Sequence, residues 1–126
     1  MIVLDTHTWL WAVDAPDRLS RSAREALART DRVGVCTVSV FELAGLALKR
    51  RVKLDVPVRD WIRDAFARSQ FEALPLSTEI AVEAAQLRFT GDPIDRIIYA
   101  TARAANARLV TRDERLWAFD PERTLW

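Results

Sequence analysis

Short apolar runs alternate with longer amphipathic segments along the whole chain. Residues 1–5 contain three consecutive apolar residues, two of them β-branched, and this run stops at Asp5. Such a run is typical of a short strand that is buried on both faces of a parallel sheet. Further strands are expected at residues 33–37, 71–75, 108–111 and, as an edge strand, 124–126.

Amphipathic spacing predicts helices between these runs. One helix is expected to begin at Trp9, and others to span residues 21–30, 39–50, 58–69, 78–88 and 93–105, with a short one ending at Trp117. Local signals support several helix ends, namely Ser20 or Ser22 and Ser77 as N-caps and Asn106 as a C-terminal stop.

This alternation predicts an α/β fold with three layers, α/β/α, around a central, mostly parallel sheet of four or five strands. A chain of 126 residues without repeats or linkers is expected to form a single domain, residues 1–126. In sheets of this type, the loops that follow the carboxyl ends of the strands form the crevice where ligands bind.

Composition excludes several classes of protein. The formal net charge of +1 argues against a protein that coats nucleic acid by charge alone, although it leaves room for a local basic rim. Cys36 is the only cysteine, which excludes a disulfide framework or a cysteine-based zinc site. No uncharged run approaches the roughly 18 residues of a membrane span, and no leader is apparent, so we expect a cytoplasmic protein with no membrane contact.

Four carboxylates occupy equivalent places after the predicted strands. Asp5 ends the first strand, and Glu42 is expected in the first turn of the helix after the second. Asp95 is expected in the first turn of its helix, and Asp113 follows the fourth strand. If the strands are parallel, all four side chains approach the same edge of the sheet.

Local structural roles could explain most of these acids. Ser39 and Glu42 have the spacing of a helix capping box. Asp92 is a good N-cap before a proline, and Asp95 would favour the same helix dipole. Asp113 could cap the short helix that follows it. Only the acid at the end of the first strand lacks an obvious local role.

The joint arrangement favours a metal site. Two carboxylates about 4 Å apart repel each other by about 4 kcal/mol at an effective dielectric constant of 20. Four converging carboxylates therefore require protonation or a cation among them. Oxygen ligands without clustered His or Cys select Mg²⁺ or Mn²⁺, and such an ion suits phosphodiester hydrolysis by an activated water.

The residues around these acids resemble a known family. The matching segments, in order and spacing, are Ile2-Val-Leu-Asp5-Thr6-His7, Ser39-x-x-Glu42, Asp92-Pro-Ile-Asp95-Arg96-x-Ile-x-Ala-Thr101-Ala and Leu109-Val-Thr111-Arg112-Asp113. Together they resemble the PIN-domain ribonucleases, and most closely the VapC-type toxins of bacterial type II toxin–antitoxin pairs. The resemblance covers essentially the whole chain and implies a PIN-like fold. The helix with Asp-Pro-x-Asp-Arg and the later Thr-Arg-Asp are its most specific motifs.

The resemblance implies metal-dependent endonucleolytic cleavage of RNA. Its catalytic and metal-binding residues would be Asp5, Glu42, Asp95 and Asp113, placed around Mg²⁺ or Mn²⁺. Asp113 stands at the position of the fourth acid, which varies within the family. The resemblance also implies a homodimer and inhibition by a small antitoxin whose tail covers the site.

Residues beside the acids are further candidates. Those that could orient the acids or a bound water are Thr6, Ser39, Asp92 and Thr111, although Ser39 and Asp92 are more simply helix caps. Arg96 and Arg112 could clamp phosphates, or form ion pairs with the neighbouring acids. His7 could contact the substrate, but packing in the first turn of its helix is the simpler role.

A basic cluster and several tryptophans have two interpretations each. Residues 49–53, Lys-Arg-Arg-Val-Lys, are most simply a solvated helix end, and an RNA track is the alternative. Trp9, Trp11 and Trp61 are most simply core residues. Five tryptophans in a chain of this size nevertheless suggest that some contact a partner.

Rival functions fit the sequence less well. A phosphatase of the haloacid dehalogenase type needs a second Asp two residues after the first, where this chain has His7. A receiver domain needs an Asp after the third strand and a late Lys, and neither is present. A catalytically silent PIN-like binding module is the third rival, and the four intact acids argue against it.

Overall fold

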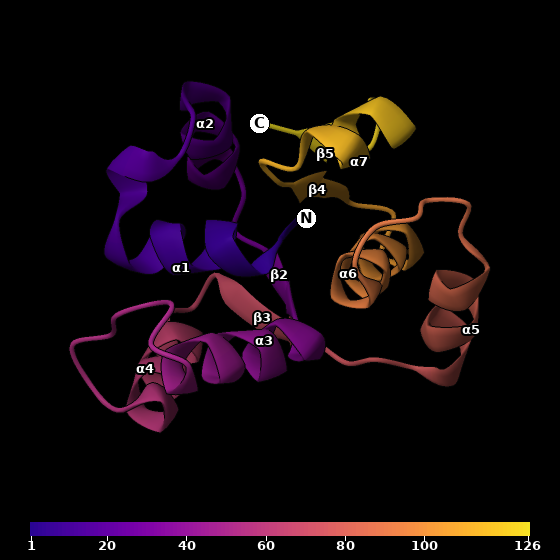
Figure 1. The fold of residues 1–126 in the computed structure, drawn as a ribbon. Coiled ribbons are helices and arrows are strands. Elements are labelled where there is room, and N and C mark those ends of the chain that lie inside the picture. Colours follow the sequence, from indigo (N-terminus) through magenta and orange to yellow (C-terminus); the bar gives the residue numbers. More distant parts are fainter.

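The computed structural model describes residues 1–126 and contains seven α-helices and five strands (Figure 1). The strands are β1 (Ile2–Leu4), β2 (Val33–Cys36), β3 (Phe71–Leu74), β4 (Arg108–Val110) and β5 (Thr124–Leu125). The helices are α1 (Thr6–Asp14), α2 (Arg21–Arg29), α3 (Thr37–Leu48), α4 (Val58–Ala67), α5 (Thr78–Gln86), α6 (Pro93–Ala104) and α7 (Glu114–Phe119), with a 3-10 helix at Pro16–Arg18. None of the helices has the length and apolar character needed to cross a bilayer.

The five strands form one sheet in the order β3-β2-β1-β4-β5, and every neighbouring pair is parallel. Strand β1 lies at the centre, where Ile2 pairs with Val33 of β2 and with Arg108 of β4. The carboxyl ends of β1, β2 and β4 therefore lie at one edge of the sheet. The prediction of an α/β fold with a mostly parallel sheet of four or five strands is confirmed.

Helices cover both faces of the sheet (Figure 1). On one face Leu4 packs among residues of α1, α2, α3 and α4, with Trp9 and Trp61 in the same cluster. On the other face Val3 packs with residues of α6 and α7, such as Ile98 and Leu116. Adjacent residues of β1 thus face opposite layers, as the alternation of a strand requires. This gives the expected three layers.

Helix α1 begins earlier than the sequence predicted. We expected a start at Trp9, but the first helical residue is Thr6. The reason is that Asp5 is the N-cap: its Oδ1 accepts a hydrogen bond of 2.9 Å from the backbone N–H of Thr8. The prediction that Asp5 lacks a local role is therefore wrong.

Helix α3 also begins earlier, at Thr37, directly after β2. Ser39 is therefore the third residue of the helix, and its buried hydroxyl has no hydrogen-bond partner. The capping box predicted for Ser39 and Glu42 does not form, because the cap position belongs to Cys36. Glu42 consequently lies in the second turn instead of the first, and capping does not explain its presence.

Other local predictions are confirmed. The hydroxyl groups of Ser20 and Ser77 accept hydrogen bonds from the N–H groups of the first turns of α2 and α5. The carboxylate of Asp92 accepts one of 2.8 Å from Ile94 N–H at the start of α6. After α6, Asn106 has a φ of 51°, the left-handed conformation typical of a helix stop.

Candidate active site

The central strand β1 ends at Asp5, in the position that parallel sheets use for ligands. The backbone N–H of Asp5 donates to the carbonyl of Val110, which ties the end of β1 to the end of β4. One carboxylate oxygen is engaged with Thr8, and the other, Oδ2, makes no hydrogen bond. Asp5 therefore combines a structural contact with a free oxygen at the sheet edge.

A cavity of about 420 Å³ opens at this edge and is lined mainly by carboxylates. We call it the acidic cavity; its lining residues are Asp5, Thr6, His7, Trp11, Glu42, Asp92, Asp95, Arg112 and Asp113. The four acids singled out by the sequence thus surround one space, although two lie in α3 and α6 and the other two follow β1 and β4. Asp92, the N-cap of α6, adds a fifth carboxylate.

The crowding of like charges is visible at Asp95, whose side chain is 28% exposed. Burial, followed by the charges of Glu42, Asp113, Asp92 and Asp5, raises the pKa of Asp95 to about 7. Both causes disfavour the charged form of a carboxyl. The acidic cavity therefore holds more negative charge than it can stabilise by itself.

Arg115, which the sequence analysis missed, partly offsets this charge. Asp113 is the N-cap of α7, and the guanidinium of Arg115 lies 3.1 Å from its Oδ2 and 3.8 Å from Oδ2 of Asp95. Burial by itself would raise the pKa of Asp113, but the hydrogen bonds and charge of Arg115 lower it overall. The available signal was that Arg115 follows Asp113 by two residues.

The carboxylates of the cavity offer only oxygen atoms as ligands, and oxygen ligands fit a hard divalent cation. Thr6 adds a buried hydroxyl in the cavity wall whose Oγ1 has no hydrogen-bond partner. No three of the histidine, cysteine and carboxylate side chains are already gathered into a set that could hold a metal ion.

The remaining polar candidates separate clearly. The hydroxyl of Thr111 accepts a hydrogen bond of 3.1 Å from the backbone N–H of Asp113, so Thr111 fixes the position of that acid. Ser39 is fully buried and does not line the acidic cavity. Of the predicted orienting residues, Thr6 and Asp92 line the cavity and Thr111 contacts one of its acids.

The two arginines predicted to bind phosphate lie in different places. Arg112 is exposed and lines the acidic cavity. Arg96 does not line it: its guanidinium donates to the carbonyls of Ala84, Ala85 and Leu87 at the end of α5. The placement predicted for Arg96 is wrong, because those unpaired carbonyls outcompete the neighbouring acids for its N–H groups.

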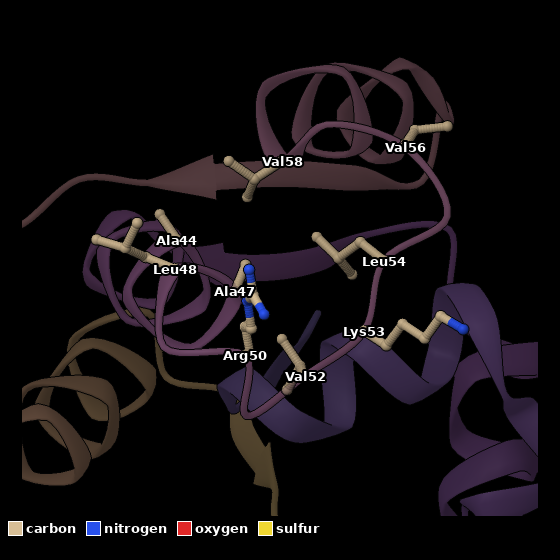
Figure 2. A pocket seen from close by; sticks show the side chains of 9 residues that line it. All are labelled: Ala44, Ala47, Leu48, Arg50, Val52, Lys53, Leu54, Val56 and Val58. Carbon is tan, nitrogen blue, oxygen red and sulfur yellow. The ribbon is translucent and has the colours of Figure 1, made fainter.

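A larger cavity, of about 710 Å³, lies away from the acids (Figure 2). We call it the apolar cavity; it is lined by Ala44, Ala47, Leu48, Arg50, Val52, Lys53, Leu54, Val56 and Val58. Figure 2 shows these side chains, which come from the second half of α3, from the segment that follows it and from the first residue of α4. The cavity is lined by no carboxylate, so the acids predicted from the sequence all lie around the smaller, acidic cavity.

Comparison with known proteins shows the family of the chain. A family model described as the PIN domain matches residues 2–120. Ribonuclease VapC22 of Mycobacterium tuberculosis is 38% identical over 115 residues, which cover 91% of this chain and 88% of the relative.

Solved structures share the fold. The chain matches a toxin-antitoxin complex from Klebsiella pneumoniae with a TM-score of 0.70 and 23% identity, covering 100% of this chain and 97% of the other. VapBC2 from Rickettsia felis, bound to a promoter DNA fragment, matches with a TM-score of 0.72 and 18% identity. That match covers 99% of this chain and 98% of the other. Mycobacterium tuberculosis VapC20, a toxin that cleaves the Sarcin-Ricin loop, matches with a TM-score of 0.66 and 18% identity over 95% of each chain.

Proposed function

The chain belongs to the PIN domain family, and from this premise we propose that it is a metal-dependent endoribonuclease and the toxin of a toxin–antitoxin pair. Its 38% identical relative is named a ribonuclease. The observation that carries the proposal is the acidic cavity, where five carboxylates converge and the pKa of Asp95 is raised to about 7. We assign the activity to a single domain, residues 1–126, in the cytoplasm.

Asp5, Glu42 and Asp95 would hold Mg²⁺ or Mn²⁺, with Asp113 as the fourth ligand. When bound, the ion lowers the pKa of a water molecule and offsets negative charge on the phosphoryl group during attack. Thr8 N–H holds one oxygen of Asp5 and leaves the other free for the ion. The backbone of Asp113 is held by Thr111, which limits the movement of that ligand.

Arg112 would bind the phosphate group at the rim of the acidic cavity. It is exposed there and forms no ion pair with a protein carboxylate, so its five N–H donors are available. Arg96 would instead hold helices α5 and α6 together. The hydroxyl of Thr6 would orient a bound water, since it has no protein partner.

The direct test is cleavage of a structured RNA by the purified protein. Wild type should cut it with Mg²⁺ or Mn²⁺ and stop when EDTA is added, and Asp5→Asn should be inactive. Asn is as good an N-cap as Asp, so this variant keeps α1 intact. Asp55→Asn, on an exposed residue away from the cavity, is the matched control and should cut like wild type.

Three outcomes would remove the proposal. Cleavage that survives EDTA or Asp5→Asn would exclude the metal mechanism. Hydrolysis of para-nitrophenyl phosphate without RNA cleavage would favour the phosphatase class. A catalytically silent PIN-like module would show neither activity under any condition.

The apolar cavity is the place we propose for a small antitoxin (Figure 2). Leu48 is 85% exposed and Val56 42% exposed at its edge, so a partner segment with apolar side chains would cover them. Some structural relatives were solved as toxin–antitoxin complexes, which supports a partner of this kind. A Leu48→Glu variant should lose a co-expressed antitoxin while keeping RNA cleavage.

We also propose a homodimer. Phe41 on α3 is 75% exposed and Val82 on α5 is 51% exposed, and both helices pack against α6. A second copy would bury these side chains. Light scattering on the purified protein should give the mass of a dimer for wild type and a lower mass for Phe41→Ser.

A further inference from the structure

A third cavity, of about 440 Å³, adjoins the acidic cavity, and these two cavities share His7 and Trp11 in their walls. We call it the basic groove. Its lining residues are His7, Leu10, Trp11, Asp14, Ala15, Arg18, Arg51, Val52 and Lys53. It lies between α1, the 3-10 helix and the basic stretch that follows α3. The two cavities are therefore neighbouring parts of one surface.

The cations of the basic groove have no carboxylate partner. Arg18, Arg51 and Lys53 are exposed, and none of them takes part in an ion pair. The one acid of the groove, Asp14, accepts a hydrogen bond of 2.9 Å from Nε1 of Trp61. Three cations thus face one carboxylate, and the excess of positive charge is free to bind a polyanion.

Aromatic rings lie at the boundary between the two cavities. The ring centroids of His7 and Trp11 are 6.0 Å apart, and Cζ of Arg18 lies 4.7 Å from the Trp11 ring. Trp11 is only 7% exposed, so it is a buried residue against which His7 and Arg18 pack. His7 is exposed, and its ring is available at the junction.

We propose that the basic groove binds the single-stranded RNA next to the phosphodiester that is cut in the acidic cavity. This inference rests on the proposed function. A strand whose phosphate lies in the acidic cavity must leave it along the surface, and the groove offers cations for the next phosphates and a ring for a base. Single-stranded nucleic acid is bound by this combination of positive groove and stacking platform.

An acidic protein segment is the other polyanion that the groove could attract. The aromatic ring at the junction favours RNA, because every base has a face that stacks on it. The basic groove also adjoins the proposed site of phosphodiester cleavage, which favours RNA because the cut strand must continue along the surface. Of the basic residues 49–53, the structure thus gives Arg51 and Lys53 a defined place beside the site.

The test is binding of a fluorescent, mixed-sequence single-stranded 12-mer RNA in EDTA, measured by anisotropy. The double variant Arg51→Ala/Lys53→Ala should bind about tenfold more weakly. The slope of log affinity against log salt should become shallower by about 1.4, since each phosphate contact contributes about 0.7 for a single strand. The control Arg24→Ala/Arg29→Ala removes two exposed cations of α2 outside the groove and should bind like wild type.

A second pair of variants tests the ring. His7→Ala should weaken binding of the same RNA severalfold, and His7→Phe should restore it, because Phe keeps the stacking surface. Weakening by both variants to the same extent would overturn the stacking role.

The remaining outcomes separate this inference from the proposed function. Equal affinity and equal salt slope for wild type and Arg51→Ala/Lys53→Ala would overturn the groove. Displacement of the RNA by a poly-glutamate peptide of the same charge, at the same concentration, would assign the groove to an acidic protein segment instead. Absence of cleavage by wild type in Mg²⁺ and Mn²⁺ would overturn the proposed nuclease, while the binding data in EDTA would still decide about the groove.

Discussion

The acidic cavity and the basic groove adjoin each other, share His7 and Trp11, and carry opposite charge. Elsewhere on the surface several charges are paired, as in the pair formed by Arg32 and Glu72 at 2.9 Å. The acidic cavity gathers five carboxylates, and only Asp95 and Asp113 form an ion pair, both with Arg115. The basic groove holds three cations that take part in no ion pair. Helix capping accounts for Asp5, Asp92 and Asp113 one by one, but not for the convergence of five carboxylates beside a cationic groove. The contrast therefore points to a ligand that satisfies both cavities.

The largest effect should come from Glu42→Gln, which distinguishes the cleavage role of the acidic cavity from the binding role of the basic groove. Because Glu42 neither caps α3 nor forms an ion pair, the substitution should leave the fold intact and lower RNA cleavage by at least about 100-fold. RNA affinity in EDTA should stay equal or rise slightly, since one repulsive charge is removed. Cleavage rates and anisotropy on the same preparation check this, and a parallel loss of binding would contradict the separation of roles.

Arg96→Ala should lower the stability of the protein and leave metal and RNA binding in the two cavities unchanged. The guanidinium donates three hydrogen bonds to the last carbonyls of α5, so its loss should lower the free energy of unfolding by about 2 kcal/mol. Urea unfolding measures this effect. RNA affinity should not change beyond what unfolding explains. If the Arg96→Ala protein were as stable as wild type but bound RNA more weakly, Arg96 would be a substrate-binding residue as the sequence predicted.

The acidic cavity should also make stability depend on pH in the metal-free protein. Asp95 has a pKa of about 7 when folded, above its ordinary value of 3.8, so the folded state holds an extra proton between these values. The free energy of unfolding should therefore decrease as pH rises from 4 to 7, by on the order of 1 kcal/mol after solvent screening.

Asp95→Asn provides the control for that pH dependence. The substitution removes the titrating group, so the decrease between pH 4 and 7 should become smaller. The variant should also be more stable than wild type at pH 8, because one like charge is gone. Urea unfolding at both pH values measures this, and identical profiles for the two proteins would contradict the crowding at Asp95.

The smallest effect should come from Arg115→Ala. Arg115 lies beside Asp113 and Asp95, where it competes with a metal cation for their oxygens. Its removal should raise the apparent affinity for Mn²⁺ by about threefold, which corresponds to an exposed ion pair of less than 1 kcal/mol. Calorimetric titration with Mn²⁺ measures this, and a weaker affinity would show that Arg115 organises the acids.

Much of this arrangement could be predicted from the sequence, because its local signals are strong. The cap at Asp92 and the stop at Asn106 follow from residue chemistry within one turn. Parallel pairing then places the strand ends at one edge, which was enough to foresee that Asp5 and the other acids share a cavity.

The failures have physical causes of two kinds. The starts of α1 and α3 were missed because each helix follows its strand with at most one residue between them, which leaves no loop to mark the boundary. The directions of long side chains were missed because they depend on distant partners: Arg96 follows Asp95 in sequence yet binds the end of α5. Arg115, by contrast, was overlooked although it reaches two of the acids.

The central claim is that the converging carboxylates form a site for a divalent cation. The most direct measurement is thermal unfolding of the metal-free protein at pH 8 while Mn²⁺ is added. A ligand that binds only the folded state must raise the melting temperature with concentration. We predict such a rise for wild type and a smaller one for Glu42→Gln; a wild-type melting temperature independent of Mn²⁺ would contradict the account.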